Sequence, residues 1–228
     1  MSPLELPIND PRPHLNYPLH ETRFHQIMMA LARWVFKPIM ILEVAGLENL
    51  PASGAAILAA NHLTQFDVFP LQLAVPRPLF FMGKAELFQI GFLHAVFRQM
   101  GGFPIYRGER DSWALDHATR ILAAGQLLAM FPEGTRSRGR GLAVAKTGVA
   151  RLALETNAPI ITASIDGSQR FFKQFPRRNP VWIVIAPPIY PNRAESPISL
   201  TERVMYSLAA NLPPDLRGVY AQAPPFGL

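Results

Sequence analysis

Apolar residues follow two alternating patterns along the chain. Short, almost continuous apolar runs are typical of strands buried on both faces of a sheet. They alternate with segments whose apolar residues recur every three or four positions, as on one side of a helix. This alternation predicts a single α/β domain with a central, mostly parallel or mixed sheet flanked by helices. The predicted strands are 39–44, 55–60, 79–82, 103–106, 127–131, 159–165 and 181–186, and the predicted helices are 21–37, 66–74, 91–100, 112–124, 146–156 and a last one opened by Ser199.

The segment 21–38 predicts an N-terminal amphipathic helix. Trp34 and Phe36 widen its apolar surface beyond the stripe that a core helix needs, and Arg33 and Lys37 are basic residues able to extend toward lipid headgroups. Such a helix suits the interface of a bilayer or simple packing on the domain, and the pattern leaves both open. The residues at helical spacing are Phe24, Ile27, Met28, Leu31 and Val35.

The ends of the chain are rich in proline. Residues 1–20 contain five prolines and predict an arm that is extended over the body or disordered. Residues 213–228 predict a proline-rich tail, which leaves 39–212 as the domain. Ser199 and Glu202 have the spacing of a capping box, and we expect the last helix to begin there.

Composition narrows the classes of function. The absence of cysteine excludes disulfides and thiolate chemistry, and the histidines outside residue 62 lack metal-ligand spacing, so no metal site is predicted. A net charge of +6 suits an anionic bilayer or a phosphorylated substrate. Without a run of five basic residues, no nucleic-acid partner is expected. No signal-peptide pattern and no run of 18 apolar residues is found, so we expect a peripheral protein at a membrane surface.

Polar residues 61–67 directly follow the predicted strand 55–60. If a helix begins near Thr64, the turn before it brings the Asp67 carboxylate to the His62 ring. The carboxylate then holds one ring nitrogen as a donor and leaves the other to accept a proton. The pair predicts a general base for a hydroxyl or thiol. The same spacing also occurs in ordinary caps and surface contacts.

A second polar stretch, 131–137, follows the predicted strand 127–131 and is dense in groups suited to holding an anion. Because the carboxyl ends of parallel strands meet at one edge of a sheet, two polar clusters in such positions indicate one shared active site.

These stretches closely resemble the motifs of the glycerophosphate acyltransferase family, which acylates glycerol-3-phosphate and lysophosphatidic acid. Asn61, His62 and Asp67 match its first motif, and residues 131–137 match its third, Phe-Pro-Glu-Gly-Thr-Arg-Ser, without a change. Residues 158–161 resemble its fourth, and Lys146 with Gly148 resembles its Lys-x-Gly. The resemblance covers roughly residues 40 to 190, most of a domain.

The resemblance implies an acyltransferase that moves a fatty acyl group from acyl-CoA or acyl carrier protein to the hydroxyl of a lysophospholipid. The favoured acceptor is 1-acylglycerol-3-phosphate, giving phosphatidic acid at the cytoplasmic face of an anionic membrane. His62 would be the general base, oriented by Asp67, with no cofactor besides the thioester co-substrate.

The family also implies roles for the remaining motif residues. Arg107 and Arg136 would bind the acceptor's phosphate, because a guanidinium grips phosphate oxygens in two-pronged fashion. Glu133 would hold a glycerol hydroxyl or orient Arg136. Gly134 would let backbone N–H groups approach an anion, and Thr135 would offer a hydroxyl. The supporting residues are Asn61, which would shape the turn, and Ser137.

The second motif departs from the family pattern. Its arginine is present as Arg107, but Tyr106 stands where the family usually has an acidic residue. The acceptor therefore stays open, with glycerol-3-phosphate or a lyso-aminolipid as alternatives. A non-catalytic protein that binds lipid or acyl carrier protein is the rival from another class, and a hydrolase that uses water is a weaker one.

Overall fold

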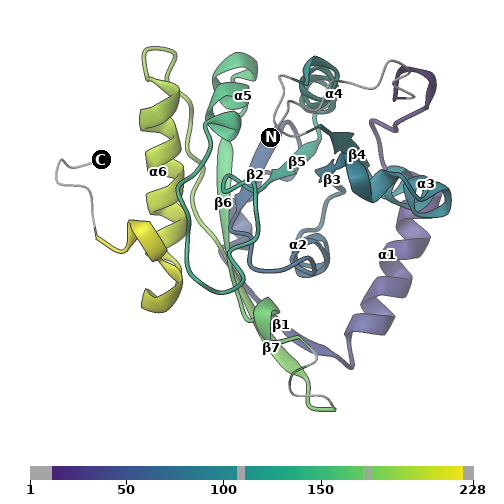
Figure 1. The fold of residues 1–228 in the computed structure, drawn as a ribbon, viewed down its shortest axis with the longest axis horizontal. Helices are drawn as coiled ribbons and strands as arrows, with labels where there is room; N and C mark the ends of the chain where they lie inside the picture. Colours follow the sequence, from purple (N-terminus) through teal and green to yellow (C-terminus); the bar gives the residue numbers. More distant parts are fainter. Residues whose placement is uncertain (1–11, 107–110, 172, 174–175, 223–228) are drawn as a thin grey trace.

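A seven-stranded sheet forms the centre of the computed structural model, which describes residues 12–106, 111–171, 173 and 176–222 (Figure 1). Its strand order is β1-β7-β6-β2-β5-β3-β4. The run β6-β2-β5-β3-β4 is parallel, β7 is antiparallel to β6, and β1 is parallel to β7. The strands are β1 (Met40–Ala45), β2 (Ala56–Ala60), β3 (Leu79–Lys84), β4 (Gly102–Ile105), β5 (Leu127–Met130), β6 (Ile160–Asp166) and β7 (Asn179–Ile185). The predicted α/β fold is confirmed.

Helices cover both faces of this sheet. In the central strand β2, Ile57 and Ala59 pack in the same cluster as residues of α4, α5 and α6, whereas Leu58 and Ala60 share a cluster with α2. Successive side chains of a strand point to opposite faces, so an apolar residue at every position requires cover on both. The helices are α1 (Arg23–Phe36), α2 (Val68–Ala74), α3 (Gly91–Gln99), α4 (Ser112–Ala123), α5 (Gly148–Thr156) and α6 (Pro197–Ala210).

Helix α1 presents its predicted apolar stripe to the outside. His25 and Met29 form its buried side, while Ile27 is 67% exposed and Trp34 is 76% exposed. Figure 1 places α1 at one side of the molecule, opposite α6. Within the described residues, no helix has the length and apolar character needed to cross a bilayer.

The start of α6 differs from the sequence prediction. Ser196, not Ser199, is the N-cap, and its side chain accepts a hydrogen bond from the Ser199 backbone N–H. Pro197 occupies the first turn, where its fixed φ and missing N–H cost nothing. The capping box predicted at Ser199 is therefore wrong by one turn.

The described part of the predicted tail packs on the domain. Leu216 is buried in a cluster with Leu63 and Leu142. Its carbonyl accepts a hydrogen bond from Leu142 N at 3.0 Å, and Leu142 O accepts one from Val219 N at 3.1 Å. The segment 214–220 thus supports both the turn after β2 and the loop after β5.

Candidate active site

Three neighbouring parallel strands bring the site together. His62 follows β2, Glu133 follows β5 and Ser168 follows β6, and these strands are adjacent in the order β6-β2-β5. The carboxyl ends of parallel strands lie at the same edge of the sheet, where α/β proteins place their ligands. The sheet order therefore gathers residues that are up to 106 positions apart.

The first motif forms the pair that the sequence predicts. His62 Nδ1 lies 2.8 Å from Asp67 Oδ2. The chain turns over residues 64–67, and α2 begins at Val68 with Asp67 as its N-cap. Asp67 is fully buried, whereas the His62 side chain is 14% exposed. With Nδ1 held by the carboxylate, Nε2 is the nitrogen that can take a proton.

Two further residues hold the Asp67 carboxylate. The Thr64 backbone N–H donates to Oδ2 at 2.9 Å, and its hydroxyl donates to Oδ1 at 3.3 Å. The Ser168 hydroxyl donates to Oδ1 at 2.5 Å and is itself buried. Sequence reasoning missed Ser168, although it follows the apolar strand β6 just as His62 follows β2. These donors fix the orientation of the carboxylate and so of the imidazole.

The second polar stretch contacts His62 from the β5 side. The Phe131 ring stacks on the imidazole, with centroids 4.0 Å apart and planes 16° apart. The backbone N–H of Ser137 donates to His62 O at 2.7 Å. The imidazole is therefore clamped between an aromatic face and a carboxylate, which restricts its rotation.

Glu133 joins two loops through its carboxylate. Oε1 accepts from the His62 backbone N–H at 2.9 Å, and Oε2 accepts from the Ala143 backbone N–H at 3.1 Å. Glu133 is 3% exposed, and burial raises the pKa of its carboxyl, while the two N–H donors oppose part of that rise. Glu133 thus orients the backbone at His62, a contact that the sequence did not predict.

Residues 134–137 complete the second polar stretch. Gly134 has φ 65°, and a Cβ there would come within 3.2 Å of the Lys146 side chain, so glycine fits both the turn and the contact. Thr135 is exposed, and Arg136 Nη1 donates to Gln65 Oε1 at 3.2 Å. Ser137 is buried, and its hydroxyl has no hydrogen-bond partner within the described residues.

Asn61 shapes the end of β2 through its side chain. Its Nδ2 donates to Ile165 O at 2.9 Å, and its Oδ1 accepts from Ile165 N at 2.7 Å. The amide thereby extends the pairing of β2 with β6 beyond the last strand residue. Arg107, predicted to bind phosphate, lies outside the described residues.

A polar cavity of about 690 Å³ is lined by residues 63–66, which lie between His62 and Asp67 in the sequence, whereas His62 and Asp67 themselves do not line it. Thr64 and Gln65 line it on the first-motif side and Ser168 on the β6 side. Most of the charged side chains that line this cavity are cationic, and Asp215 is the acidic one among its lining residues. The cations are Arg136, Arg138, Arg170 and Lys173.

Arg138 and Arg170 were missed by the sequence analysis. Arg138 adopts a left-handed backbone conformation, φ 57°, and its N–H donates to Leu63 O at 3.1 Å. A non-glycine residue in that conformation is uncommon and costs free energy. Arg170 lies 3.4 Å from Asp166 and over the Trp182 ring. Their arrangement makes this cavity a candidate anion site.

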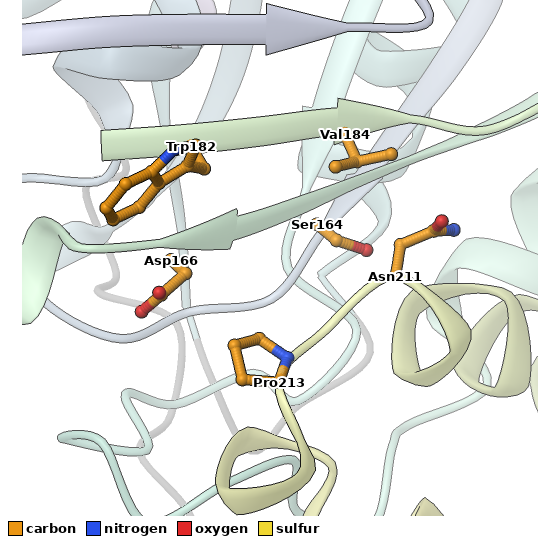
Figure 2. Close-up of a pocket in the computed structure, with 6 residues that line it drawn as sticks. All are labelled: Ser164, Asp166, Trp182, Val184, Asn211 and Pro213. Atoms are coloured by element: carbon orange, nitrogen blue, oxygen red, sulfur yellow. The ribbon is translucent and has the colours of Figure 1, made fainter. Parts of the chain in front are cut away.

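A separate hollow of about 380 Å³ lies between the β6–β7 pair and the end of α6 (Figure 2). Asp166 and Trp182 line one end of it, Val184 and Asn211 line the other, and Pro213 lies between them. Neither motif contributes any of its six lining residues. Residues of both motifs line the 690 Å³ cavity, among them Thr64 and Arg136, and that cavity is therefore the candidate substrate site.

Comparison with known proteins gives one family. Residues 41–166, more than half of the chain, match the family model described as Acyltransferase. An uncharacterized protein of Mycobacterium tuberculosis is 31% identical over 161 residues, which cover 64% of this chain and 43% of that protein. The 1-acyl-sn-glycerol-3-phosphate acyltransferase of Borreliella burgdorferi is 30% identical over 57% of this chain and 52% of its own length. The chain thus spans about half the length of these curated relatives.

A solved structure shares the fold. The 1-acyl-sn-glycerophosphate (LPA) acyltransferase PlsC from Thermotoga maritima superimposes with a TM-score of 0.67 at 26% identity, over 81% of this chain and 76% of that one.

Proposed function

The chain belongs to the Acyltransferase family, and we propose that it transfers a fatty acyl group from an acyl thioester to the hydroxyl of a lysophospholipid. The favoured acceptor is 1-acylglycerol-3-phosphate, which would give phosphatidic acid. The single observation that carries the proposal is the His62–Asp67 contact, because it prepares Nε2 as a base at the strand edge. The named activities of the Borreliella and Thermotoga relatives support the choice of acceptor.

The reaction needs one base and no covalent enzyme intermediate. His62 Nε2 takes the proton of the acceptor hydroxyl as its oxygen attacks the thioester carbonyl carbon. The new C–O bond forms, the C–S bond breaks, and the imidazolium returns its proton to the leaving thiolate. Asp67 stabilises the imidazolium and keeps its Nδ1 proton in place. Acyl-CoA and acyl carrier protein both supply such a thioester.

Phosphate recognition falls to the cations around the polar cavity. Arg136 is held toward this cavity by Gln65, at 3.2 Å. The carboxyl end of β4 is at the same edge of the sheet as that of β2, because β4 is parallel to β2 through β3 and β5. Arg107 comes two positions after the last residue of β4 in the sequence and lies outside the described residues. We propose that these two arginines bind the acceptor's phosphate and thereby place its free hydroxyl at Nε2.

Thioester consumption by the purified protein tests this function. Acyl-CoA is supplied with lysophosphatidic acid, glycerol-3-phosphate, a lyso-aminolipid or no acceptor, for wild type and His62→Ala. The expected result is turnover with lysophosphatidic acid that falls at least ~100-fold in His62→Ala, the low end of general-base effects. Equal rates in a folded His62→Ala protein would refute the mechanism, and thioester loss without acceptor would indicate a hydrolase.

We further propose that α1 lies on an anionic membrane surface at the cytoplasmic face. Its outward side combines exposed Ile27, Leu31 and Trp34 with Arg33 and Lys37, the combination expected of an interfacial helix. A second exposed apolar group lies around the start of α3, which Figure 1 places at one end of α1. It consists of Leu87, Ile90 and Phe92, exposed by 54, 60 and 77%.

Vesicle co-sedimentation tests the membrane contact. Replacing Ile27 and Leu31 by glutamate should weaken binding to anionic phosphatidylglycerol vesicles by roughly tenfold or more, since each loses apolar burial and meets like charge. Ile198→Glu is the matched control, because Ile198 is 66% exposed on α6 at the opposite side of the molecule. An equal loss of vesicle binding in Ile198→Glu and in the variant with both Ile27 and Leu31 replaced would refute this orientation of α1. No loss of binding in that double variant would refute it as well.

A further inference from the structure

The polar cavity and the hollow beside Trp182 share a wall. Arg170 lines the cavity, and its Nη2 lies 3.4 Å from Oδ2 of Asp166, which lines the hollow. The Arg170 guanidinium also lies over the Trp182 ring, 5.8 Å from its centre. On the other side, Pro213 lines the hollow and Asp215 lines the cavity, two positions apart in one turn. A cationic cavity therefore adjoins a hollow that contains an indole (Figure 2).

The polar cavity is connected to the catalytic pair through two of its lining residues. Thr64 donates to the Asp67 carboxylate through its backbone N–H at 2.9 Å, and Ser168 donates through its hydroxyl at 2.5 Å. A ligand in the cavity is thus separated from Asp67 by these two residues. To react at His62, such a ligand needs a long arm that carries its reacting group from the cavity to Nε2.

The cavity holds more positive charge than the acceptor's phosphate requires. A phosphate monoester carries a charge of about −1.5 to −2 at pH 7, and the proposed function already assigns Arg136 to it. Within the described part of the chain, Arg138 forms no ion pair, and Arg170 shares its charge with Asp166 alone. The left-handed backbone of Arg138, φ 57°, costs free energy, and such strain is concentrated at functional sites. These two arginines are therefore available for a second anion.

The hollow beside Trp182 suits a flat heterocyclic ring. Trp182 is 38% exposed, and its Nε1 donates to Glu43 Oε2 at 3.0 Å, which fixes the orientation of the indole. Nucleotide bases stack on aromatic side chains, with a contribution from arginine. Carboxylate and amide groups form hydrogen bonds with the edges of bases, and Asp166 and Asn211 supply one of each. The hollow therefore offers both kinds of contact that a base makes.

We propose that the polar cavity and the adjoining hollow bind the nucleotide of a coenzyme A thioester, with its phosphates on Arg138 and Arg170 and its adenine on Trp182. Coenzyme A carries phosphates and adenine at one end and its thioester at the end of a long pantetheine arm, which matches a site separated from His62. Acyl carrier protein has the same arm without a nucleotide, so it would leave the hollow empty. The inference names the acyl donor and rests on the proposed function.

Calorimetric titration with coenzyme A alone tests the site without the reaction. The Kd should rise at least roughly tenfold in Arg138→Met and in Arg170→Met, because each variant loses charge-assisted hydrogen bonds to phosphate. Arg203→Met is the matched control: Arg203 also pairs with a carboxylate, Glu195 at 2.8 Å, and lines neither the cavity nor the hollow. Thermal unfolding checks that each variant is folded. A wild-type Kd in both test variants, or an equal rise in Arg203→Met, would overturn the proposal.

Tryptophan fluorescence tests where the adenine binds. Coenzyme A and adenosine 3′,5′-bisphosphate should both quench the emission of the wild-type protein, and pantetheine, which lacks the base, should not. The chain has three tryptophans, so Trp182→Leu keeps the emission of Trp34 and Trp113 but should lose the quenching. The Kd for coenzyme A should also rise by roughly tenfold, on the scale of one lost base–aromatic stack. Quenching that persists in Trp182→Leu would overturn the placement of the base.

Donor kinetics separate this inference from the proposed function. The ratio of kcat/KM for acyl-CoA to that for acyl-pantetheine should fall at least roughly tenfold in the double variant Arg138→Met with Arg170→Met, because only acyl-CoA has the nucleotide. A rise in the KM for lysophosphatidic acid instead would assign these arginines to the acceptor. A loss confined to acyl carrier protein as donor would assign them to a carrier-protein surface. Either result would overturn the inference and leave the proposed function standing. If coenzyme A binds as expected and no acceptor is acylated, the nucleotide site stands and the proposed function fails.

Discussion

Replacing Asp67 by asparagine separates the charge of this residue from its geometry. In a Ser-His-Asp triad, replacing the aspartate by asparagine inverts the tautomer of the histidine, at a cost of about 10⁴ in kcat. Here Oδ2 accepts from both His62 Nδ1 and the Thr64 backbone N–H, and a backbone N–H cannot reverse its role. In Asp67→Asn the amide oxygen should therefore keep the Oδ2 position.

The rest of the environment accepts the new amide group. Oδ1 faces the hydroxyls of Thr64 and Ser168, which can rotate to accept from an NH₂ group. The tautomer of His62 is then preserved, and only the attraction between carboxylate and imidazolium is lost. For charges about 4 Å apart at an effective dielectric constant of 20, this attraction is about 4 kcal/mol, or about 10³ in kcat.

Initial rates of CoA release at saturating acceptor measure the effect, with thermal unfolding as the check on folding. Ser168→Ala is the matched control, because it removes one donor to Asp67 and keeps the charge; kcat should stay within about tenfold of wild type. A fall in kcat of less than about tenfold in Asp67→Asn would show that the carboxylate charge contributes little to catalysis. A loss of about 10⁴ or more in kcat would indicate the inverted tautomer and refute the argument from Thr64.

Three other predictions concern the acceptor, pH and one turn. In Arg136→Lys, KM for the phosphorylated acceptor should rise with little change in kcat, because lysine lacks the planar fork; an unchanged KM in acceptor titrations would contradict the assignment. Burial, together with nearby Arg120, lowers the pKa of His117 from 6.5 to about 4. Below pH 6.5 the unfolded chain therefore binds this proton more readily than the folded protein. Stability should be lost as the pH falls from 6.5 to 4, by up to about 3 kcal/mol in all. Urea unfolding of wild type and His117→Phe checks this, and an identical pH dependence of the two would refute it. Gly167→Ala should destabilise the protein by about 1–3 kcal/mol in urea unfolding, since φ is 102° and a Cβ would collide with Pro180 O; a stability equal to wild type would contradict that geometry.

Local sequence predicted the elements well where one physical cause dominates. Residues 56–60 are apolar throughout and lie between polar segments, which requires a strand covered on both faces wherever it sits in the sheet. Helix α6 shows where local sequence is ambiguous: Ser196 and Ser199 both suit the N-cap position. Proline favours the first turn of a helix, and Pro197 therefore favours Ser196 as the cap. For α1, the spacing of apolar residues predicted a helix but not which side of it is buried. His25 and Met29, which are buried, are no more apolar than the residues that face outward.

What the sequence by itself determined is the α/β fold class and the chemical pair His62 and Asp67, because strand pattern and five-residue spacing are local properties. Only the tertiary structure decided what surrounds that pair. Ser168 reaches Asp67 because β6 lies beside β2, and Glu133 reaches His62 because β5 lies on the other side. Arg12 meets Asp111 across 99 positions because the segment before α1 packs against the end of β4 and the start of α4. Strand order and chain packing are set by the burial of the whole apolar surface, so no single stretch of sequence contains them.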